Sequence, residues 1–219
     1  DTGDTEGEVL ETRDVNVTQE QIEAVLAQFR RPILQTPPMY SALKRDGKPL
    51  YEYARAGITL EREARPVTIH KLEFLGYEAP FLKLSVMCSK GTYIRVLGED
   101  IGHALGCGGH LNALRRTQVG SLTLDGVVTL DELTAHAAPL SLLAPVDALL
   151  SSFPAVQLTE ELAKRFLHGQ RIALGKEEVA VPAEPGRVRV YHDSKLLGTG
   201  QLQEYSILAP ERLIATVHP

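Results

Sequence analysis

The chain has 219 residues, of which 43% are hydrophobic and 23% are charged, and its formal net charge is −5. This composition is typical of a soluble protein with a sizeable core, and no apolar run approaches the roughly 20 residues of a membrane span. Only two cysteines are present and no basic, apolar leader is visible, which argues against a disulfide framework and a secretory signal.

The charge is unevenly distributed along the chain. Residues 1–29 carry one basic and eight acidic side chains, residues 30–116 carry 14 basic and eight acidic, and residues 117–219 carry eight basic and 12 acidic. A basic middle between acidic flanks is typical of a surface that meets an anionic partner. A solvated surface of mixed charge is the alternative on charge alone.

The first helix signal is Thr18, followed three residues later by Gln21, which together predict a capping box. An apolar face running from Ile22 to Phe29 follows, and Pro32 ends the helix. The stretch from Gln35 to Pro49 has no convincing period, and long irregular stretches of this kind are usually functional or disordered. Pro49 suits the first position of a short helix.

The middle of the chain predicts a hairpin and then a second helix. Val67–Tyr77 and Phe81–Cys88 alternate like two strands around a turn at Ala79. A helix is expected after Thr92 with a buried stripe from Ile94 to Leu105. We also expect a helix and loop over residues 111–116 and a broken helix over residues 129–143.

The sequence changes character between Pro145 and Pro154. The remainder has one short helix, capped by Thr159, among brief strands such as Val179–Val181 and Val188–Tyr191 that alternate with Gly and Pro turns. We therefore expect an α+β protein with a boundary near Leu150, giving domains at 1–150 and 151–219.

The segment Cys88-Ser-Lys-Gly-Thr-Tyr-Ile-Arg95 carries the clearest chemical signal. It places Lys90 and Arg95 at the start of a helix, where the helix dipole disfavours a cation unless an anion binds there. An arginine suits a bidentate carboxylate contact, so a carboxylate or phosphate partner is predicted. A nucleotide P-loop is excluded because its glycines and its Gly-Lys-Thr order are missing. The alternative is that both cations simply face solvent.

Other polar residues have two interpretations each. Asp1–Gly7 is typical of a polar turn, and Arg95 could pair with Glu99 on its own helix. Tyr40 and its neighbouring tyrosines could stack on bases or simply pack. Cys107-Gly-Gly-His110 has a metal-like spacing without a second ligand pair, so free thiols and no metal are expected.

Taken together, the motifs resemble those of the TruB family of bacterial tRNA pseudouridine synthases, which act at position 55 of the tRNA T-loop. The resemblance runs in order from Asp1 to about Leu133 and fades afterwards. Its most specific parts are Gln35-Thr-Pro-Pro-Met-Tyr-Ser-Ala-Leu-Lys44, Gly47–Gly57, Cys88–Arg95 and Leu114-Arg-Arg-Thr117.

This resemblance implies part of a pseudouridine synthase catalytic domain, with a mixed or antiparallel sheet and flanking helices, followed by a small β-rich PUA-like RNA-binding domain. It implies a thumb-like RNA-binding insertion over about residues 35–65, base flipping, no cofactor, and a cytoplasmic monomer that binds the tRNA T-stem-loop. The family's nucleophilic aspartate lies in a Gly-His-x-Gly-x-Leu-Asp-Pro segment, which this sequence does not contain. We expect that segment to lie upstream of Asp1, and we expect this chain alone to be inactive. Asp131 is a poor match for the nucleophile, because it lies late in the sequence and the glycines of the segment are missing around it.

The resemblance also implies roles for individual residues. Arg95 would pair with the nucleophile, Asp4 would belong to the same charge network, and Tyr93 and Leu114 would line the pocket that receives the flipped uridine. The residues expected to contact the substrate are Tyr40, Lys44, Arg55, Arg65, Lys90, Leu114, Arg115 and Arg116. The competing hypotheses are a noncatalytic RNA-binding or tRNA-folding protein and, more remotely, a small-molecule enzyme built on the Lys90–Arg95 helix end.

Overall fold

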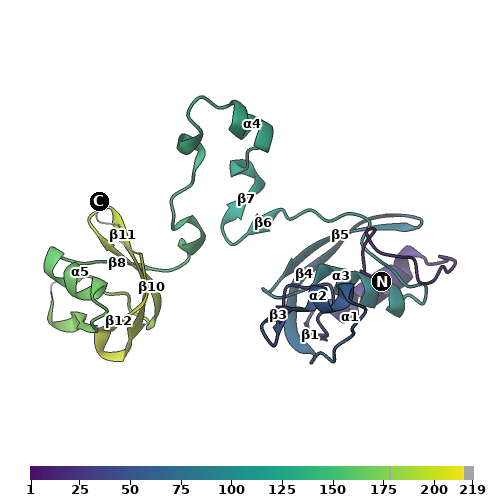
Figure 1. The fold of residues 1–219 in the computed structure, drawn as a ribbon, viewed down its shortest axis with the longest axis horizontal. Coiled ribbons are helices and arrows are strands. Elements are labelled where there is room, and N and C mark those ends of the chain that lie inside the picture. Colours follow the sequence, from purple (N-terminus) through teal and green to yellow (C-terminus); the bar gives the residue numbers. More distant parts are fainter. Residues whose placement is uncertain (178, 215–219) are drawn as a thin grey trace. The chain divides into compact units, whose positions relative to one another are not determined.

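The computed structural model describes residues 1–177 and 179–214. The chain divides into two compact units, Asp1–Arg115 and Arg116–Pro219, each with its own strands and helices (Figure 1). All predicted site residues except Arg116 lie in the first unit.

The first unit is built on an antiparallel sheet of three strands, β1 (Pro32–Gln35), β4 (Arg65–Glu78) and β5 (Phe81–Cys88), in the order β1-β4-β5. Two helices, α1 (Gln19–Phe29) and α3 (Ile94–Ala104), pack with the sheet around one core. The buried residues of this core are Ile22, Val25, Leu26, Ile69, Leu72, Leu97 and Ile101.

Local sequence explains where these elements begin. The side chain of Thr18 accepts a hydrogen bond from the backbone of Gln21, whose side chain accepts one from Thr18 in return, so the predicted capping box is confirmed. The expected hairpin is confirmed as β4 and β5. The expected second helix is confirmed as α3.

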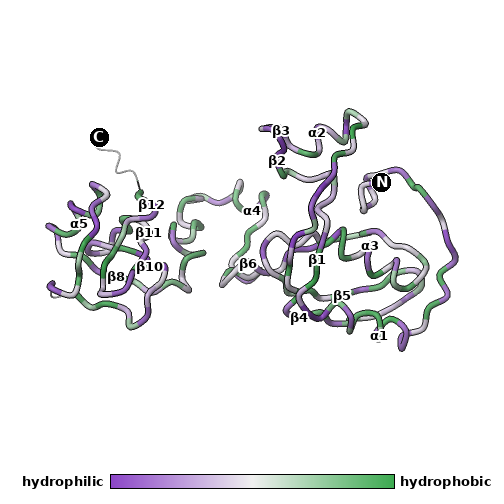
Figure 2. The backbone as a smooth tube through the Cα atoms, turned by 90° about the horizontal axis from the view of Figure 1, so that it is seen from below, coloured by the Kyte–Doolittle hydropathy of each residue, from purple (hydrophilic) through white to green (hydrophobic). Residues whose placement is uncertain are grey.

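The insertion, residues 35–65, leaves the sheet at the end of β1 and returns at the start of β4, where Gln35 lies opposite Arg65. It contains β2 (Lys44–Arg45), β3 (Lys48–Pro49) and α2 (Leu50–Arg55). Asp46 and Gly47 both have positive φ, which suits the tight turn between β2 and β3. Figure 2 shows this part standing off the sheet. Pro49 is the residue before α2 rather than its first residue.

The second unit begins with a sparsely packed stretch. It contains β6 (Gln118–Val119), β7 (Leu122–Thr123), η1 (Leu124–Gly126), α4 (Leu130–Ala135), η2 (Pro139–Leu142) and η3 (Ala148–Leu150). The expected break in the helical region after residue 129 is confirmed. None of residues 116–155, all of which the structure describes, is buried.

The rest of this unit is a sheet of five strands with the order β8-β10-β11-β12-β9. A core of twelve buried residues, centred on Phe166 of α5, lies against this sheet. The strands are β8 (Ala155–Gln157), β9 (Ile172–Ala173), β10 (Gly186–His192), β11 (Lys195–Gln203) and β12 (Ile207–Leu213); the helical segments are α5 (Glu160–Leu167), η4 (Leu174–Lys176) and η5 (Glu204–Ser206).

The expected α+β class with a β-rich C-terminal part is confirmed. Two local expectations were wrong. Residues 111–116 form no helix, because the backbone N–H of Leu111 donates to Gly3 at 2.9 Å instead of to its own turn. Val179–Val181 lies outside the sheet, since Pro182 follows it and the two valines pack on the core from a loop. In the described ranges no helix is both long enough and apolar enough to cross a membrane.

Candidate functional site

Helix α3 places Arg95 at the centre of a polar network. Tyr93 is the N-cap and makes no side-chain cap, and no acidic residue lies in the first turn. Arg95 is the second residue of this helix, so its charge meets the positive end of the helix dipole. Compensation must therefore come from another part of the chain.

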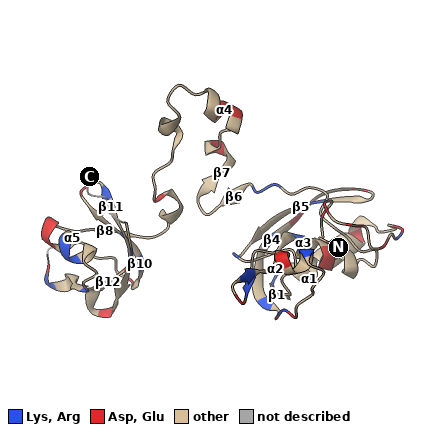
Figure 3. Cartoon of the chain, viewed as in Figure 1, with Lys and Arg blue, Asp and Glu red and all other residues tan. Residues whose placement is uncertain are grey.

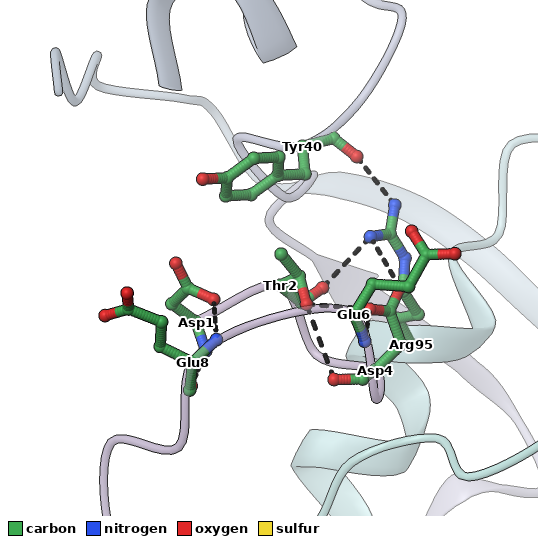
Figure 4. A network of polar contacts seen from close by, with 7 residues as sticks. All are labelled: Asp1, Thr2, Asp4, Glu6, Glu8, Tyr40 and Arg95. Atoms are coloured by element: carbon green, nitrogen blue, oxygen red, sulfur yellow. Dashed lines mark hydrogen bonds and ion pairs between the residues drawn. The ribbon is translucent and has the colours of Figure 1, made fainter. Parts of the chain in front are cut away.

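That compensation comes from two distant segments (Figure 4). The Nη1 atom of Arg95 donates to the carbonyl oxygen of Thr2 at 3.0 Å and to Oδ2 of Asp4 at 3.1 Å. Its Nη2 atom donates to the carbonyl oxygen of Tyr40 at 2.6 Å. A guanidinium has five N–H groups, so these contacts leave two of them for a ligand.

Both carboxylate oxygens of Asp4 are occupied within the chain. Oδ1 accepts from the Thr2 hydroxyl at 2.7 Å and from the backbone N–H of Glu6 at 3.1 Å, while Oδ2 accepts from Arg95. The hydrogen bond from the Thr2 hydroxyl has the largest effect on the pKa of Asp4 and lowers it; burial has the second largest effect and opposes it, while the Glu6 N–H and then Arg95 lower the pKa further. Asp4 is therefore an ionised, fully engaged partner of Arg95 and is poorly placed to act as a nucleophile.

The turn that carries Asp4 is held against α3 by Gly3 and Leu111. Gly3 is buried with φ +77°, and a Cβ there would lie 2.4 Å from Oε1 of Glu99. Leu111 bridges to Asp4 as an isolated strand pair. The positive φ favours glycine at position 3, whereas the Glu99 carboxylate is the end of a flexible side chain and could move aside. The alternative pairing of Arg95 with Glu99 does not form in the described structure.

A pocket of about 280 Å³, the Arg95 pocket, opens beside this network. Arg95, Asp4 and Glu6 are its charged lining residues, and Leu111 and Leu114 contribute apolar surface. Leu114 is 65% exposed, so its side chain is available to a ligand. The complete lining is Asp4, Thr5, Glu6, Arg95, Leu111, Asn112, Ala113 and Leu114.

Tyr93, Lys90 and Arg65 lie together at a second depression of about 160 Å³, the Lys90 pocket. Tyr93 and Leu114 therefore line different pockets, although we expected both to face one uridine. Gln35, which is only 2% exposed, lies at the boundary of the Lys90 pocket and hydrogen bonds to the backbone of Tyr93. The complete lining is Gln35, Pro37, Leu43, Arg65, Pro66, Val67, Lys90, Gly91 and Tyr93.

Lys44 and Arg55 lie on the insertion and line neither pocket, and both are exposed. Three of the six basic residues of the insertion, Lys44, Arg45 and Lys48, lie in the β2–β3 hairpin. Figure 3 shows the Lys and Arg residues of the chain in blue. The ring of Tyr51 lies 5.2 Å from the guanidinium carbon of Arg55, and that of Tyr53 lies 5.0 Å from Nζ of Lys48. These two tyrosines are thus engaged within the insertion, whereas Tyr40 contributes its carbonyl to Arg95 and its ring points away from the guanidinium (Figure 4).

Arg115 and Arg116 directly follow the Leu114 wall of the Arg95 pocket, and both are exposed. Cys88 and Cys107 are free thiols. Within residues 1–177 and 179–214, no group of three or more Cys, His, Asp or Glu side chains could hold a metal ion.

Three residues of this region were not predicted as site residues. Thr2 orients Asp4, Asn112 lines the Arg95 pocket, and Gln35 contacts the start of α3. A polar residue at the end of a short apolar strand is a weak sequence signal for Gln35. The contacts of Thr2 and Asn112 depend on pairing between chain segments about 100 residues apart, which no local pattern reveals.

Three family models together match most of the chain. Residues 1–94 match the TruB family pseudouridylate synthase N-terminal domain. Residues 95–151 match the tRNA pseudouridylate synthase B C-terminal domain, and residues 154–214 match the pseudouridine synthase II TruB C-terminal model.

Two similar proteins are both named tRNA pseudouridine synthase B. A tRNA pseudouridine synthase B of Burkholderia mallei (strain NCTC 10247) is 59% identical over 220 residues, covering 98% of this chain and 72% of its own length. The protein of that name from Ralstonia pickettii (strain 12J) is 55% identical over 228 residues, covering 97% of this chain and 70% of its own length.

Two solved structures share the fold. A chain of a Cbf5-Nop10-Gar1 complex has a TM-score of 0.69 at 22% identity, with 91% of this chain and 63% of that chain covered. A chain of an H/ACA RNP bound to a substrate RNA containing 2′-deoxyuridine has a TM-score of 0.70 at 20% identity, with 94% and 64% covered. This chain therefore spans less than two thirds of those solved chains.

Proposed function

Because this chain belongs to the TruB family of pseudouridylate synthases, we propose that it acts in the conversion of uridine 55 of the tRNA T-loop to pseudouridine. The substrate would be the T-stem-loop, bound by a cytoplasmic monomer. The observation that carries the proposal is the Arg95 network, in which an arginine at a helix N-terminus lies beside a pocket with two N–H groups still available.

The reaction breaks the bond between N1 of uracil and C1′ of ribose and joins C5 to C1′; C5 loses its proton to solvent and N1 takes one up, so that product and substrate are isomers. A carboxylate nucleophile divides this exchange into easier steps. Arg95 suits the binding of such a carboxylate, because its remaining N–H groups would stabilise the ionised form. Asp4 would hold Arg95 in place rather than attack, since both of its oxygens are engaged.

The nucleophile would come from outside these 219 residues. In the family it belongs to a Gly-His-x-Gly-x-Leu-Asp-Pro segment, which the sequence does not contain. Asp131 offers no substitute, because the glycines of that segment are missing around it and it is an exposed residue in the first turn of α4. We therefore expect the 219-residue chain alone to bind RNA poorly or partly and not to isomerise uridine.

RNA binding would use the exposed cations around the two pockets and on the insertion. Lys44 and Arg55 would contact phosphates from the insertion, and Lys90 and Arg65 would do so at the Lys90 pocket. A uridine inside a folded loop must leave the stack before its C5 can be reached, so the Arg95 pocket would receive a flipped base against Leu114.

The test is to incubate an unmodified tRNA transcript with the full gene product and to map pseudouridine by mass spectrometry after cyanoethylation with acrylonitrile, because pseudouridine has the same mass as uridine until its free N1 is labelled. We expect modification at position 55 and at no other uridine. The matched substrate replaces uridine 55 with cytidine and should stay unmodified. Modification elsewhere with an intact position 55 would contradict the proposed site, and tight binding without any modification would favour the noncatalytic RNA-binding function.

A further inference from the structure

One short segment connects the insertion to the helix that carries Arg95. At its first residue, the side-chain amide of Gln35 accepts from the backbone N–H of Tyr93 at 3.1 Å and donates to the carbonyl oxygen of Tyr93 at 3.3 Å. At its last residue, the carbonyl oxygen of Tyr40 accepts from Arg95 at 2.6 Å. Residues 35–40 are thus tied at both ends to residues 93–95.

The first tie belongs to the scaffold. Gln35 is the last residue of β1 and is only 2% exposed, so its amide is held in a fixed place. Tyr93 is the N-cap of α3 and has no side-chain cap of its own. The amide of Gln35 instead holds the backbone N–H and carbonyl group of Tyr93 itself, and so it fixes the position of the residue from which α3 starts.

The second tie belongs to the insertion. Among the described residues, the bond from Arg95 to Tyr40 is the hydrogen bond that joins residues 36–64 to the rest of the first unit; the contact of Arg62 with Pro37 lies within the insertion. Pro37 and Pro38 stand between the two ties, and proline fixes φ. A displacement of the insertion is therefore transmitted to Tyr40 with little slack.

Arg95 also holds Asp4 and borders the Arg95 pocket. Its guanidinium therefore has one edge on the insertion and another on the acidic turn (Figure 4). If the insertion displaces the carbonyl oxygen of Tyr40, the Arg95 guanidinium either moves with it or loses its shortest hydrogen bond.

We propose that residues 35–40 form a coupling segment that sets the position of the Arg95 guanidinium according to the position of the insertion, with Gln35 as the positioning residue at its fixed end. Contact of RNA with the insertion then aligns Arg95 for the carboxylate and the uridine. This inference rests on the proposed function. If the segment works in this way, changes within it alter kcat and leave the affinity for RNA nearly unchanged.

The first test replaces Gln35 in the full gene product. Gln35→Met keeps the length and approximate volume of the side chain and removes both hydrogen bonds to Tyr93. We expect kcat for pseudouridine formation to fall roughly tenfold, since small errors in the position of a reacting group can reduce rates up to about 100-fold. The KM and the Kd for tRNA should change less than about threefold.

The second test loosens the segment without removing either tie. Pro38→Gly adds backbone freedom between Gln35 and Tyr40, and Pro145→Gly makes the same change at an exposed position of the second unit, outside the insertion. We expect Pro38→Gly to lower kcat with little change in KM and Pro145→Gly to leave both unchanged. If Gln35→Met does not fold, the comparison of Pro38→Gly with its control variant tests the coupling instead.

The coupling is overturned if Gln35→Met and Pro38→Gly both turn over at the wild-type rate. It is equally overturned if their loss appears as weaker tRNA binding, or if Pro145→Gly is as slow as Pro38→Gly. A wild-type protein with no turnover at all contradicts the proposed function itself, which distinguishes the two failures.

Discussion

Arg95 occupies a position that its own helix disfavours, and the cost of a cation at that end is about 0.3–1 kcal/mol. Asp4 and the carbonyl groups of Thr2 and Tyr40 offset that cost from other segments. The sequence predicts an anionic partner for Arg95, and Asp4 is one such partner. Two N–H groups of the Arg95 guanidinium remain, so a further anionic group can still bind at this position.

The ionised state of Asp4 should make this network sensitive to acid. Folding lowers the pKa of Asp4 from its usual 3.8, so the stabilisation is fully present above that pH and is lost as the pH falls through the lower folded value. We expect the melting temperature of wild type to exceed that of Asp4→Asn near pH 6. The difference should shrink as the pH falls below 3.8.

Thermal unfolding followed by circular dichroism over this pH range checks the expectation. Asp14→Asn, at an exposed aspartate outside the network, is the control and should follow wild type throughout. A gap between wild type and Asp4→Asn that stays constant with pH would show that the carboxylate contributes nothing to folding through its charge.

Helix α3 and the loop that follows it form one wall of the Arg95 pocket, and two glycines of this helix differ in what they face. A Cβ at Gly102 would lie 2.3–2.5 Å from the backbone of Gly108 and Gly109, whereas a Cβ at Gly98 would lie 3.4 Å from Leu111. Backbone atoms cannot move aside without displacing the loop.

We therefore expect Gly102→Ala to lower the free energy of unfolding by about 1–3 kcal/mol through overpacking. Gly98→Ala makes an ordinary contact and should raise it by up to about 1 kcal/mol, because alanine favours the helix. Urea denaturation of both variants provides the measurement. A stable Gly102→Ala protein would mean that the loop over residues 108–114 is not packed against α3 as described.

The insertion is the element expected to contact phosphates. If Lys44 contacts one phosphate, Lys44→Gln should weaken tRNA binding and reduce the slope of log K against log salt by about 0.7–0.9. Lys83→Gln, at an exposed position of β5, is the matched control and should leave the slope unchanged. Equal slopes for wild type and Lys44→Gln, measured by filter binding at several salt concentrations, would remove Lys44 from the interface.

The elements with local signals were predictable from the sequence. The capping box at Thr18, the alternation in β4 and β5, and the apolar stripe of α3 each depend on neighbours a few residues apart. The ties of Arg95 to Thr2 and of Gln35 to Tyr93 join segments 93 and 58 residues apart, so no periodic pattern reports them. The resemblance identified Asp4 and Arg95 as one network, whereas the occupation of both Asp4 oxygens became visible only in the structure.

At the scale of the whole molecule, the chain contains two separate cores. One lies among α1, α3 and the β1-β4-β5 sheet, and the other lies around Phe166. Residues 116–155 contribute no buried residue to either. The contacts within the chain divide it into two units after Arg115, whereas two family models meet between residues 151 and 154. These two divisions differ, so the domain boundary that we expected near Leu150 stays a prediction.

Limited proteolysis tests that boundary. Because residues 116–155 are exposed and unburied, we expect first cleavage there and a folded C-terminal fragment that retains the core from Val156 to Leu208. Mass spectrometry of the fragments gives the cut sites. First cleavage within residues 156–208, or a C-terminal fragment that is degraded at once, would contradict an independently folded second unit.

The central claim is that the Arg95 network serves uridine isomerisation, and tritium release from C5 of the target uridine in T-loop RNA tests it most directly. We predict release by the full gene product, no release by its Arg95→Ala variant, and none by the 219-residue chain alone. Release by the Arg95→Ala variant at the wild-type rate would contradict the role of Arg95. Release by the 219-residue chain alone would contradict a nucleophile from outside this sequence.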